Sequence, residues 1–313
     1  MIVGSGSIAL RYSEIIESIH GSELQIVSDF QLESIGKQRV FNREIFSQQA
    51  QSGSEIYDLL IIASVNSRHI TDFEIFSSIA KRVLIEKPLF TSSLSEHELR
   101  IFESYGGDLI VSSPLRFHNA FVDLSKNLNL VGSVNFIEVR CQSWLPNWRP
   151  GRDFRRGFWN EPTQGGVLRE IIHELDYLLK LFGPLEVLWA TMTDSKLLDL
   201  EVESGVSAIL RTKSGNIIDL RLDYCSHPPR RHFRIEGDQG TFHWDVLQGT
   251  LSFTNSQGVD LKEYPEDRNR NTTFMRQIES LVNSESWDVS GTDLVEANES
   301  LKLVEKLYRA SGR

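Results

Sequence analysis

The first part of the chain alternates short apolar segments with polar segments that suit helices. Strands are predicted at 1–3, 24–28, 59–63, 83–85 and 109–112, and helices between them at 13–20, 43–52, 69–81 and 94–105. A strand–helix alternation of this kind indicates a parallel sheet covered by helices on both faces. The N-terminal part is therefore expected to be a doubly wound α/β domain.

The pattern changes near residue 127. Longer alternating segments follow, and strands are predicted at 133–143, 187–193, 206–212, 216–224, 232–236, 241–245 and 250–253, with helices near 274–282 and at 293–310. The turn sequences KSGN at 213–216 and GDQG at 237–240 favour a mainly antiparallel sheet. We expect two domains, 1–118 and 119–313, whose final helices could pack back on the first domain.

The segment 165–179, GGVLREIIHELDYLL, has the apolar spacing of an amphipathic helix. Its leucines and isoleucines fall on one side of the helix. The polar side carries Arg169, Glu170, His173, Glu174, Asp176, Tyr177 and Lys180. Taken alone, the segment favours a solvated polar face, and a reaction centre formed by Glu170, His173 and Asp176 is the alternative.

Composition limits the classes of function. The 313 residues carry a net charge of −10, and the basic residues are scattered, which disfavours nucleic acid as a partner. Cys141 and Cys225 fit neither a disulfide framework nor a metal-ligand spacing, so we expect buried free thiols and no metal site. No apolar run approaches the ~18–20 residues that span a bilayer. A soluble cytoplasmic protein with no membrane partner is expected.

The N-terminal sequence MIVGSGSIA places Gly4 and Gly6 directly after a strand, and Ala9 completes a G-x-G-x-x-A pattern. The first glycine permits the tight turn, the second lets backbone amides approach a pyrophosphate, and the third small residue allows close packing of helix and strand. The pattern predicts dinucleotide binding by residues 4–8, namely Gly4, Ser5, Gly6, Ser7 and Ile8. A structural glycine turn is the alternative.

Later residues refine the expected cofactor. Asp29 follows the second strand, where an acidic residue accepts hydrogen bonds from the adenosine ribose, and this favours NAD. Ser28 with Lys37 or Arg39 could accommodate a 2′-phosphate, so NADP stays open. The segment 63–69, ASVNSRH, ends the third predicted strand at the edge where a cofactor would lie. Its candidate cofactor contacts are Ala63, Ser64, Asn66 and His69.

The segment VLIEKPL at 83–89 places Glu86 and Lys87 at the carboxyl end of an apolar strand. In an open α/β sheet this end faces the ligand crevice, so Glu86 is expected at the cofactor and Lys87 where a cation meets both substrate and nicotinamide. A lysine in a surface turn is the alternative.

Together these motifs resemble the Gfo/Idh/MocA family of NAD(P)-dependent oxidoreductases. The resemblance rests on the glycine turn, ASVNSRH, EKP, LRFH at 115–118, and the Gly-Gly segment with His173 and Asp176. It implies an N-terminal Rossmann domain and a C-terminal α/β domain with a large open antiparallel sheet. It also implies a homodimer or homotetramer, and adds Arg116 and His118 as candidate substrate-binding residues.

Two departures from the family pattern stand out. The family places an aspartate four residues before the histidine, whereas Arg169 stands there and Glu170 stands three before it. Either spacing leaves an acid on the helix face of His173, so the acid's role passes to Glu170. Ser64-Val65 replaces Thr-Pro in the cofactor loop.

The segment 144–159, WLPNWRPGRDFRRGFW, precedes the predicted catalytic helix. Guanidinium groups bind phosphate or carboxylate, and indole rings stack on sugars. Candidate substrate contacts are Trp148, Arg149, Arg152 and Arg155, and salt bridges between domains or subunits are the alternative. With the later LDY and PPRR, these residues resemble a family branch associated with bacterial surface sugars.

The resemblance implies hydride transfer between a nicotinamide cofactor and a hydroxyl or keto carbon of a sugar. His173 would act as the acid/base, since imidazole titrates near neutral pH. Lys87 would hydrogen-bond the reacting oxygen, and Glu170 or Asp176 would orient His173. A non-catalytic dinucleotide- and sugar-binding regulator and an NAD-dependent glycosidase are the alternatives.

Overall fold

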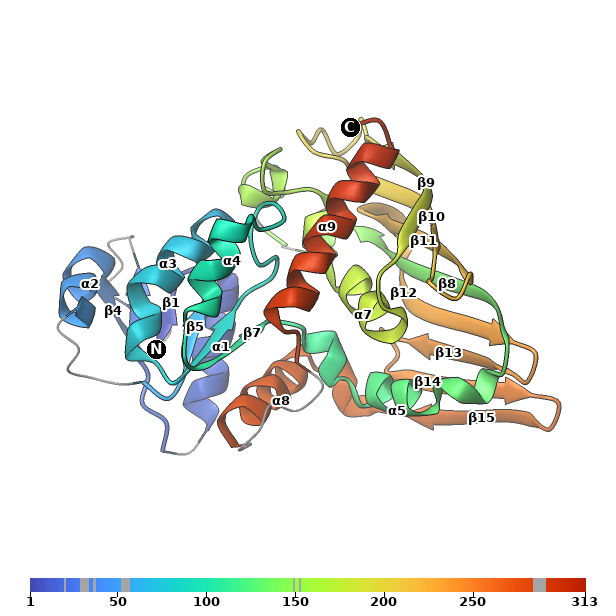
Figure 1. The fold of residues 1–313 in the computed structure, drawn as a ribbon, viewed down its shortest axis with the longest axis horizontal. Coiled ribbons are helices and arrows are strands. Elements are labelled where there is room, and N and C mark those ends of the chain that lie inside the picture. Colours follow the sequence, from blue (N-terminus) through green and yellow to red (C-terminus); the bar gives the residue numbers. More distant parts are fainter. Residues whose placement is uncertain are drawn as a thin grey trace. The chain divides into compact units, whose positions relative to one another are not determined.

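The structure is a computed structural model of the chain, and it describes residues 1–19, 21–28, 34–35, 38–51, 57–148, 150–151, 153–283 and 291–313. These residues form two compact units (Figure 1). Unit 1 comprises Met1–Pro114 and Asn271–Asn298, and unit 2 comprises Leu115–Arg270 and Glu299–Arg313. The chain therefore passes from one unit to the other three times. The domain boundary expected after residue 118 stays a prediction.

Unit 1 contains a seven-stranded sheet in the order β3-β4-β2-β1-β5-β6-β7. Its strands are β1 (Ile2–Val3), β2 (Ile26–Ser28), β3 (Ser34–Ile35), β4 (Gln38–Asn42), β5 (Leu60–Ile62), β6 (Arg82–Ile85) and β7 (Asp108–Val111). Neighbouring strands are parallel except β3 and β4, which are antiparallel. The six parallel strands follow the order of a Rossmann sheet, which confirms the predicted fold class for the N-terminal part.

The helices of unit 1 bury the apolar strands. They are α1 (Ser7–Ser18), α2 (Arg43–Gln51), α3 (His69–Phe76), α4 (Glu96–Glu103) and α8 (Arg270–Asn283). Ala9, Tyr12 and Ile15 of α1 pack in the same apolar cluster as Phe274 and Ile278 of α8. The N-terminal unit thus incorporates a helix from near the end of the chain.

Unit 2 contains an eight-stranded sheet in the order β15-β14-β13-β12-β8-β11-β10-β9. Its strands are β8 (Val134–Trp144), β9 (Glu186–Thr193), β10 (Gly205–Arg211), β11 (Ile217–Asp223), β12 (Cys225–Gly237), β13 (Thr241–Asp245), β14 (Thr250–Asn255) and β15 (Gly258–Glu263). Only β8 and β11 pair in parallel among these neighbours. The predicted mainly antiparallel sheet is confirmed.

The helices of unit 2 pack on one face of this sheet (Figure 1). They include α5 (Asn119–Asn127), α6 (Val167–Glu170), α7 (His173–Phe182) and the C-terminal part of α9 (Leu294–Ala310). Tyr177 of α7 meets Phe233 edge-on at 6.0 Å between ring centroids, and Phe121 of α5 meets Trp244 at 5.6 Å. Alternate strand residues such as Ile137 and Val139 are buried under these helices, so their neighbours point to the opposite face. We call that opposite face the open face.

The single helix expected over 165–179 is wrong. The chain forms α6 and then α7, and Ile171 between them adopts φ −103° and ψ 32°, outside helical geometry. Glu170 and His173 therefore do not occupy positions i and i+3 of one continuous helix. Cys141 is a buried free thiol, as predicted, but Cys225 is partly exposed. Every helix in the described part of the chain is too short or too polar to cross a lipid bilayer.

Candidate active site

The glycine turn joins β1 to α1. Gly4 has φ +129°, and a Cβ there would lie 2.4 Å from the backbone oxygen of Ala63. Gly6 precedes α1 as its N-cap, and a Cβ there would meet no atom within 4 Å. Gly4 is thus required by the fold, whereas Gly6 faces open space at a helix N-terminus, where amide groups and the helix dipole favour an anion. These residues, with Ser7 and Ile8 in the first turn of α1, fit a bound pyrophosphate.

The end of β2 approaches the same turn. The Ser28 hydroxyl donates to the Ser5 hydroxyl at 2.8 Å, and Ser28 is buried. This contact gives Ser28 a role in fixing the turn. Asp29 and Lys37 lie outside the described residues, as does the side chain of Arg39. The choice between NAD and NADP therefore stays a prediction.

The loop after β5 is held by buried polar contacts. The Ser64 hydroxyl donates to Asp72 at 2.6 Å, and the Asn66 side chain accepts from the Ser67 amide at 3.1 Å. The ring nitrogens of His69 lie 3.1 Å from the carbonyl oxygens of Leu89 and Ser64. Burial lowers the pKa of His69 to about 4, so its ring is neutral at pH 7. His69 thus supports the loop that carries Ala63 and Ser64 at the carboxyl edge of the sheet.

Glu86 and Lys87 follow β6 at the same edge. Glu86 is buried, and its carboxylate accepts from the Tyr12 hydroxyl at 2.6 Å and from the Lys87 amide at 3.2 Å. Gln277 of α8 donates to the Tyr12 and Ser112 hydroxyl oxygens, each at 3.3 Å. This network fixes the backbone on which Lys87 sits. The Lys87 side chain is only partly buried.

In unit 2, the Gly-Gly segment begins α6 above a buried carboxylate. Gly166 has φ +98°, and a Cβ there would lie 2.4 Å from Glu203 Oε1. The same oxygen accepts from the Leu168 amide at 3.2 Å and from the Tyr308 hydroxyl at 2.9 Å. Burial raises the pKa of Glu203. Arg169, which stands where the family has an acid, donates to the Tyr308 hydroxyl oxygen at 3.1 Å.

The polar side of α7 is not a solvated face. Glu174 is fully buried and accepts from Arg231 at 2.6 and 3.2 Å. Asp176 accepts from Arg116 at 2.8 and 2.9 Å, with side chains 9% and 0% exposed. The first interpretation of the segment is therefore wrong, because each of these acids is buried against an arginine distant in sequence. His173, at the first position of α7, stays partly exposed.

These contacts bear on two predicted site residues. Arg116 is held by the Asp176 carboxylate, which accounts for its burial, and its contact with substrate stays a prediction. His118 precedes α5 and is buried beside Asp267 and Trp244. Asp267 accepts from the amides of Asn119 and Ala120 at 3.1 and 3.0 Å and so caps α5. His118 thus lies in the interior of unit 2.

An aromatic pocket lies in unit 2 beside α6. Its lining residues are Leu145, Trp148, Phe154, Trp159, Glu170 and Tyr224. Trp148 meets Tyr224 edge-on at 5.3 Å between ring centroids, and its indole donates to Ser143 at 2.7 Å. The Tyr224 hydroxyl is buried and has no hydrogen-bond partner among the described residues. Burial, with the charge of Glu170, raises the pKa of Tyr224 well above 10, so the hydroxyl remains a donor.

The three arginines of the 144–159 loop that were predicted to contact substrate divide into two groups. Arg149 and Arg152 lie outside the described residues. Arg155 is exposed, lies 4.4 Å from the centre of the Phe154 ring, and is 3.7 Å from Asp153. The loop thus supplies aromatic rings to the pocket, and the predicted substrate contact of Arg155 remains untested.

Sequence reasoning missed Tyr224, Phe154 and Trp159 as lining residues. Trp159 and Phe154 belong to the aromatic loop that was singled out, so composition gave a signal for them. Tyr224 belongs to the LDY motif at 222–224, but nothing in the sequence placed it beside the loop, because it lies there through the pairing of β11 with β8 some 80 residues away.

The two sheets define a two-unit α/β protein with a Rossmann sheet and a large mixed sheet. Residues 129–243 match the family model described as the GFO/IDH/MocA C-terminal domain. The match bears out, over this segment, the family resemblance drawn from the motifs.

Individual proteins are similar over different lengths. The chain is 29% identical over 147 residues to scyllo-inositol 2-dehydrogenase (NADP(+)) IolU of Bacillus subtilis, which covers 45% of this chain and 44% of that protein. The match thus spans less than half of that relative's length.

Solved structures match over nearly the full length. An oxidoreductase from Agrobacterium radiobacter, in complex with NAD+, L-tartaric acid and magnesium, has a TM-score of 0.80 at 16% identity, covering 100% of this chain and 95% of the other. UDP-N-acetylglucosamine 3-dehydrogenase GnnA from Acidithiobacillus ferrooxidans has a TM-score of 0.75 at 18% identity, covering 99% and 96%. At these identities the likeness shows the fold.

Proposed function

We propose that the chain is an NAD(P)-dependent dehydrogenase that acts on a secondary hydroxyl of a sugar or cyclic polyol. The observation that carries the proposal is the glycine turn of unit 1, which leaves open space at the N-terminus of α1. In unit 2, aromatic side chains gather beside Glu170 around a narrow pocket of about 10 Å³. Aromatic faces with a few polar groups are typical of sites for small molecules. The names of the similar enzymes, which act on scyllo-inositol and UDP-N-acetylglucosamine, support the substrate class.

The glycine turn supports the cofactor. Gly6 leaves open space before α1, and Glu86 fixes the backbone of Lys87 at the carboxyl edge of the Rossmann sheet. A bound nicotinamide dinucleotide would supply the hydride acceptor. The turn would bind its pyrophosphate through the amides that begin α1.

The chain's own side chains would handle the proton. The His173 imidazole would accept the proton of the substrate hydroxyl and return it in the reverse direction. The Lys87 ammonium would donate a hydrogen bond to the same oxygen and stabilise its developing negative charge. Glu170 and Tyr224 would bind neighbouring hydroxyl groups and orient the ring. Asp176 would act only by holding α7 through Arg116.

The test is the appearance of reduced nicotinamide absorbance with a panel of polyols, sugars and sugar nucleotides, using NAD and NADP in turn. Lys87→Ala and His173→Ala should each lower turnover by at least ~100-fold while binding cofactor normally. Lys81→Ala and His243→Ala change exposed residues of the same types and should leave turnover unchanged. If no substrate reduces the cofactor, or if both active-site variants keep full rates, the proposal is wrong. Aglycone release without reduced cofactor would indicate the glycosidase instead.

A further inference from the structure

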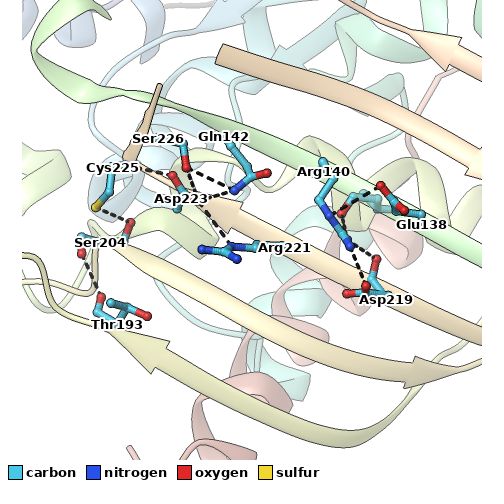
Figure 2. A network of polar contacts seen from close by, with 11 residues as sticks. Glu138, Arg140, Gln142, Thr193, Ser204, Asp219, Arg221, Asp223, Cys225 and Ser226 are labelled. Carbon is cyan, nitrogen blue, oxygen red and sulfur yellow. Dashed lines mark hydrogen bonds and ion pairs between the residues drawn. The ribbon is translucent and has the colours of Figure 1, made fainter. Parts of the chain in front are cut away.

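A second pocket lies in unit 2, on the open face of the eight-stranded sheet, and Figure 2 shows the polar network of four residues that line it, Arg140, Gln142, Arg221 and Ser226. It has a volume of about 290 Å³. Three adjacent strands or their ends supply its lining residues, which are Arg140, Gln142, Arg221, Ser226, His227 and Arg230. None of these residues was assigned to the proposed active site.

The alternation of β12 separates two neighbouring arginines. Arg231 points to the helix-covered face, where it binds Glu174, while Arg230 lines the open-face pocket. Successive strand residues point to opposite faces, so the two arginines of PPRR lie on opposite faces of the sheet. Arg230 forms no ion pair with any residue that the structure describes.

The strand register brings like charges together. Arg140 lies directly beside Arg221 across the parallel β8–β11 pair, and Gln142 lies directly beside Arg230 across β8 and β12. Like charges directly opposite one another destabilise a sheet unless a counter-charge balances them. A counter-charge is therefore required near these guanidinium groups.

The acids of the open face balance only part of this charge. Asp219 binds Arg140 at 2.5 Å. Asp223 accepts from Gln142 at 2.6 Å and from the Ser226 hydroxyl at 2.9 Å, and its carboxylate is 3.7 Å from Arg221 (Figure 2). Asp223 thus orients these two neutral groups and also forms an ion pair with Arg221. Glu138 also lies 3.7 Å from Arg140, so Arg140 and Arg221 each have an acid within 4 Å, whereas Arg230 has none among the described residues.

We propose that this pocket binds a small multivalent oxyanion, either free phosphate or the phosphoryl group of a metabolite. Planar guanidinium groups donate paired hydrogen bonds to such oxygens, and a phosphate carries enough charge to balance two of them. The Trp144 ring, 4.9 Å from that of His227, forms an aromatic edge beside the pocket.

Isothermal titration of the full chain with inorganic phosphate, at fixed ionic strength, tests the proposal. We expect saturable binding of one phosphate per chain. Arg230→Gln should lower the affinity for phosphate at least ~10-fold, because it removes one charge-assisted hydrogen-bonding partner. Arg234→Gln is the matched control. It removes the same charge from the same face of β12, where Arg234 pairs with Glu236 at 3.0 Å, and should change the affinity by less than ~2-fold.

Two further ligands distinguish free phosphate from a phosphorylated metabolite as the bound anion. Glucose 6-phosphate binding more tightly than phosphate, with no binding of glucose, would support a phosphorylated metabolite, and equal affinities would support free phosphate. Arg221→Gln should weaken binding as Arg230→Gln does, and circular dichroism should show both variants folded. Absence of saturable binding, or equal weakening by Arg230→Gln and Arg234→Gln, would overturn the proposal. A change of molecular mass in Arg230→Gln without a change in phosphate affinity would also overturn it, and would indicate a contact between copies of the chain.

Discussion

Replacing Asp176 by asparagine separates a structural role of this carboxylate from a catalytic one. The Asp176 side chain is 9% exposed and that of Arg116 is fully buried, and two hydrogen bonds of 2.8 and 2.9 Å join them. Asp176→Asn keeps the size of the side chain and removes its charge. The guanidinium would then be buried without a counter-charge.

Breaking a buried ion pair by removing one partner costs ~3–5 kcal/mol. The asparagine oxygen can still accept one hydrogen bond from Arg116, so we expect the lower end of this range. That value corresponds to an increase on the order of 100-fold in the unfolded fraction. Because the Asp176 carboxylate already binds Arg116, turnover of the remaining folded enzyme should change far less than in His173→Ala.

Urea-induced unfolding followed by tryptophan fluorescence measures this loss. The signal reports mainly unit 2, which contains five of the six tryptophans, namely Trp144, Trp148, Trp159, Trp189 and Trp244. Asp219→Asn is the control, because its partner Arg140 lies on the open face with both side chains partly exposed, and we expect a loss of at most ~1 kcal/mol. If Asp176→Asn lowers stability by less than ~1 kcal/mol but abolishes turnover, the structural role is refuted.

Two further predictions concern unit 1. Gly4→Ala should destabilise the fold because its Cβ would meet backbone atoms of Ala63, whereas Gly6→Ala should leave stability within ~1 kcal/mol and weaken cofactor binding, as measured by denaturation and by titration with NAD and NADP. Equal effects of the two substitutions on stability would contradict this reading of the turn. The second prediction concerns His69, whose pKa falls from 6.5 to about 4 on folding. The unfolded chain therefore gains a proton in this range that the folded chain does not. The stability contributed by His69 is complete above pH ~6.5 and declines below it by up to ~1.4 kcal/mol per pH unit until about pH 4. In His69→Gln, this contribution to the dependence of the unfolding free energy on pH should be absent. If the unfolding free energy of both proteins changes equally between pH 6.5 and 4, the lowered pKa of His69 is contradicted.

The sequence predicted strands best where one face is buried. Residues 241–245 form β13 with the predicted bounds, since Phe242 and Trp244 alternate with polar neighbours. The strand at Gly258–Glu263 was missed although Val259 and Leu261 alternate with polar residues; the alternation is short, and every residue of the strand is exposed. Periodicity reports burial, so an exposed edge strand leaves little signal.

For the candidate active site, prediction from the sequence is limited by contacts between distant residues. The apolar spacing of 165–179 predicted a helix but neither the break at Ile171 nor the burial of Glu174 and Asp176. Their partners, Arg231 and Arg116, are 57 and 60 residues away in the sequence. Only folding brings these charges together. A pattern confined to 15 residues therefore predicts solvent exposure for side chains that the structure buries in ion pairs.

The position of α8 in unit 1 constrains the order in which the chain can fold during synthesis. Phe274 and Ile278 complete the apolar cluster around α1, and Gln277 joins the polar network of Tyr12. About 150 residues of unit 2 are translated before them, which takes on the order of 10–30 s at ribosomal rates. During this interval the nascent N-terminal sheet lacks α8, and part of its apolar surface stays exposed. A ribosome stalled before residue 271 would carry an incomplete nucleotide-binding unit that chaperones can bind.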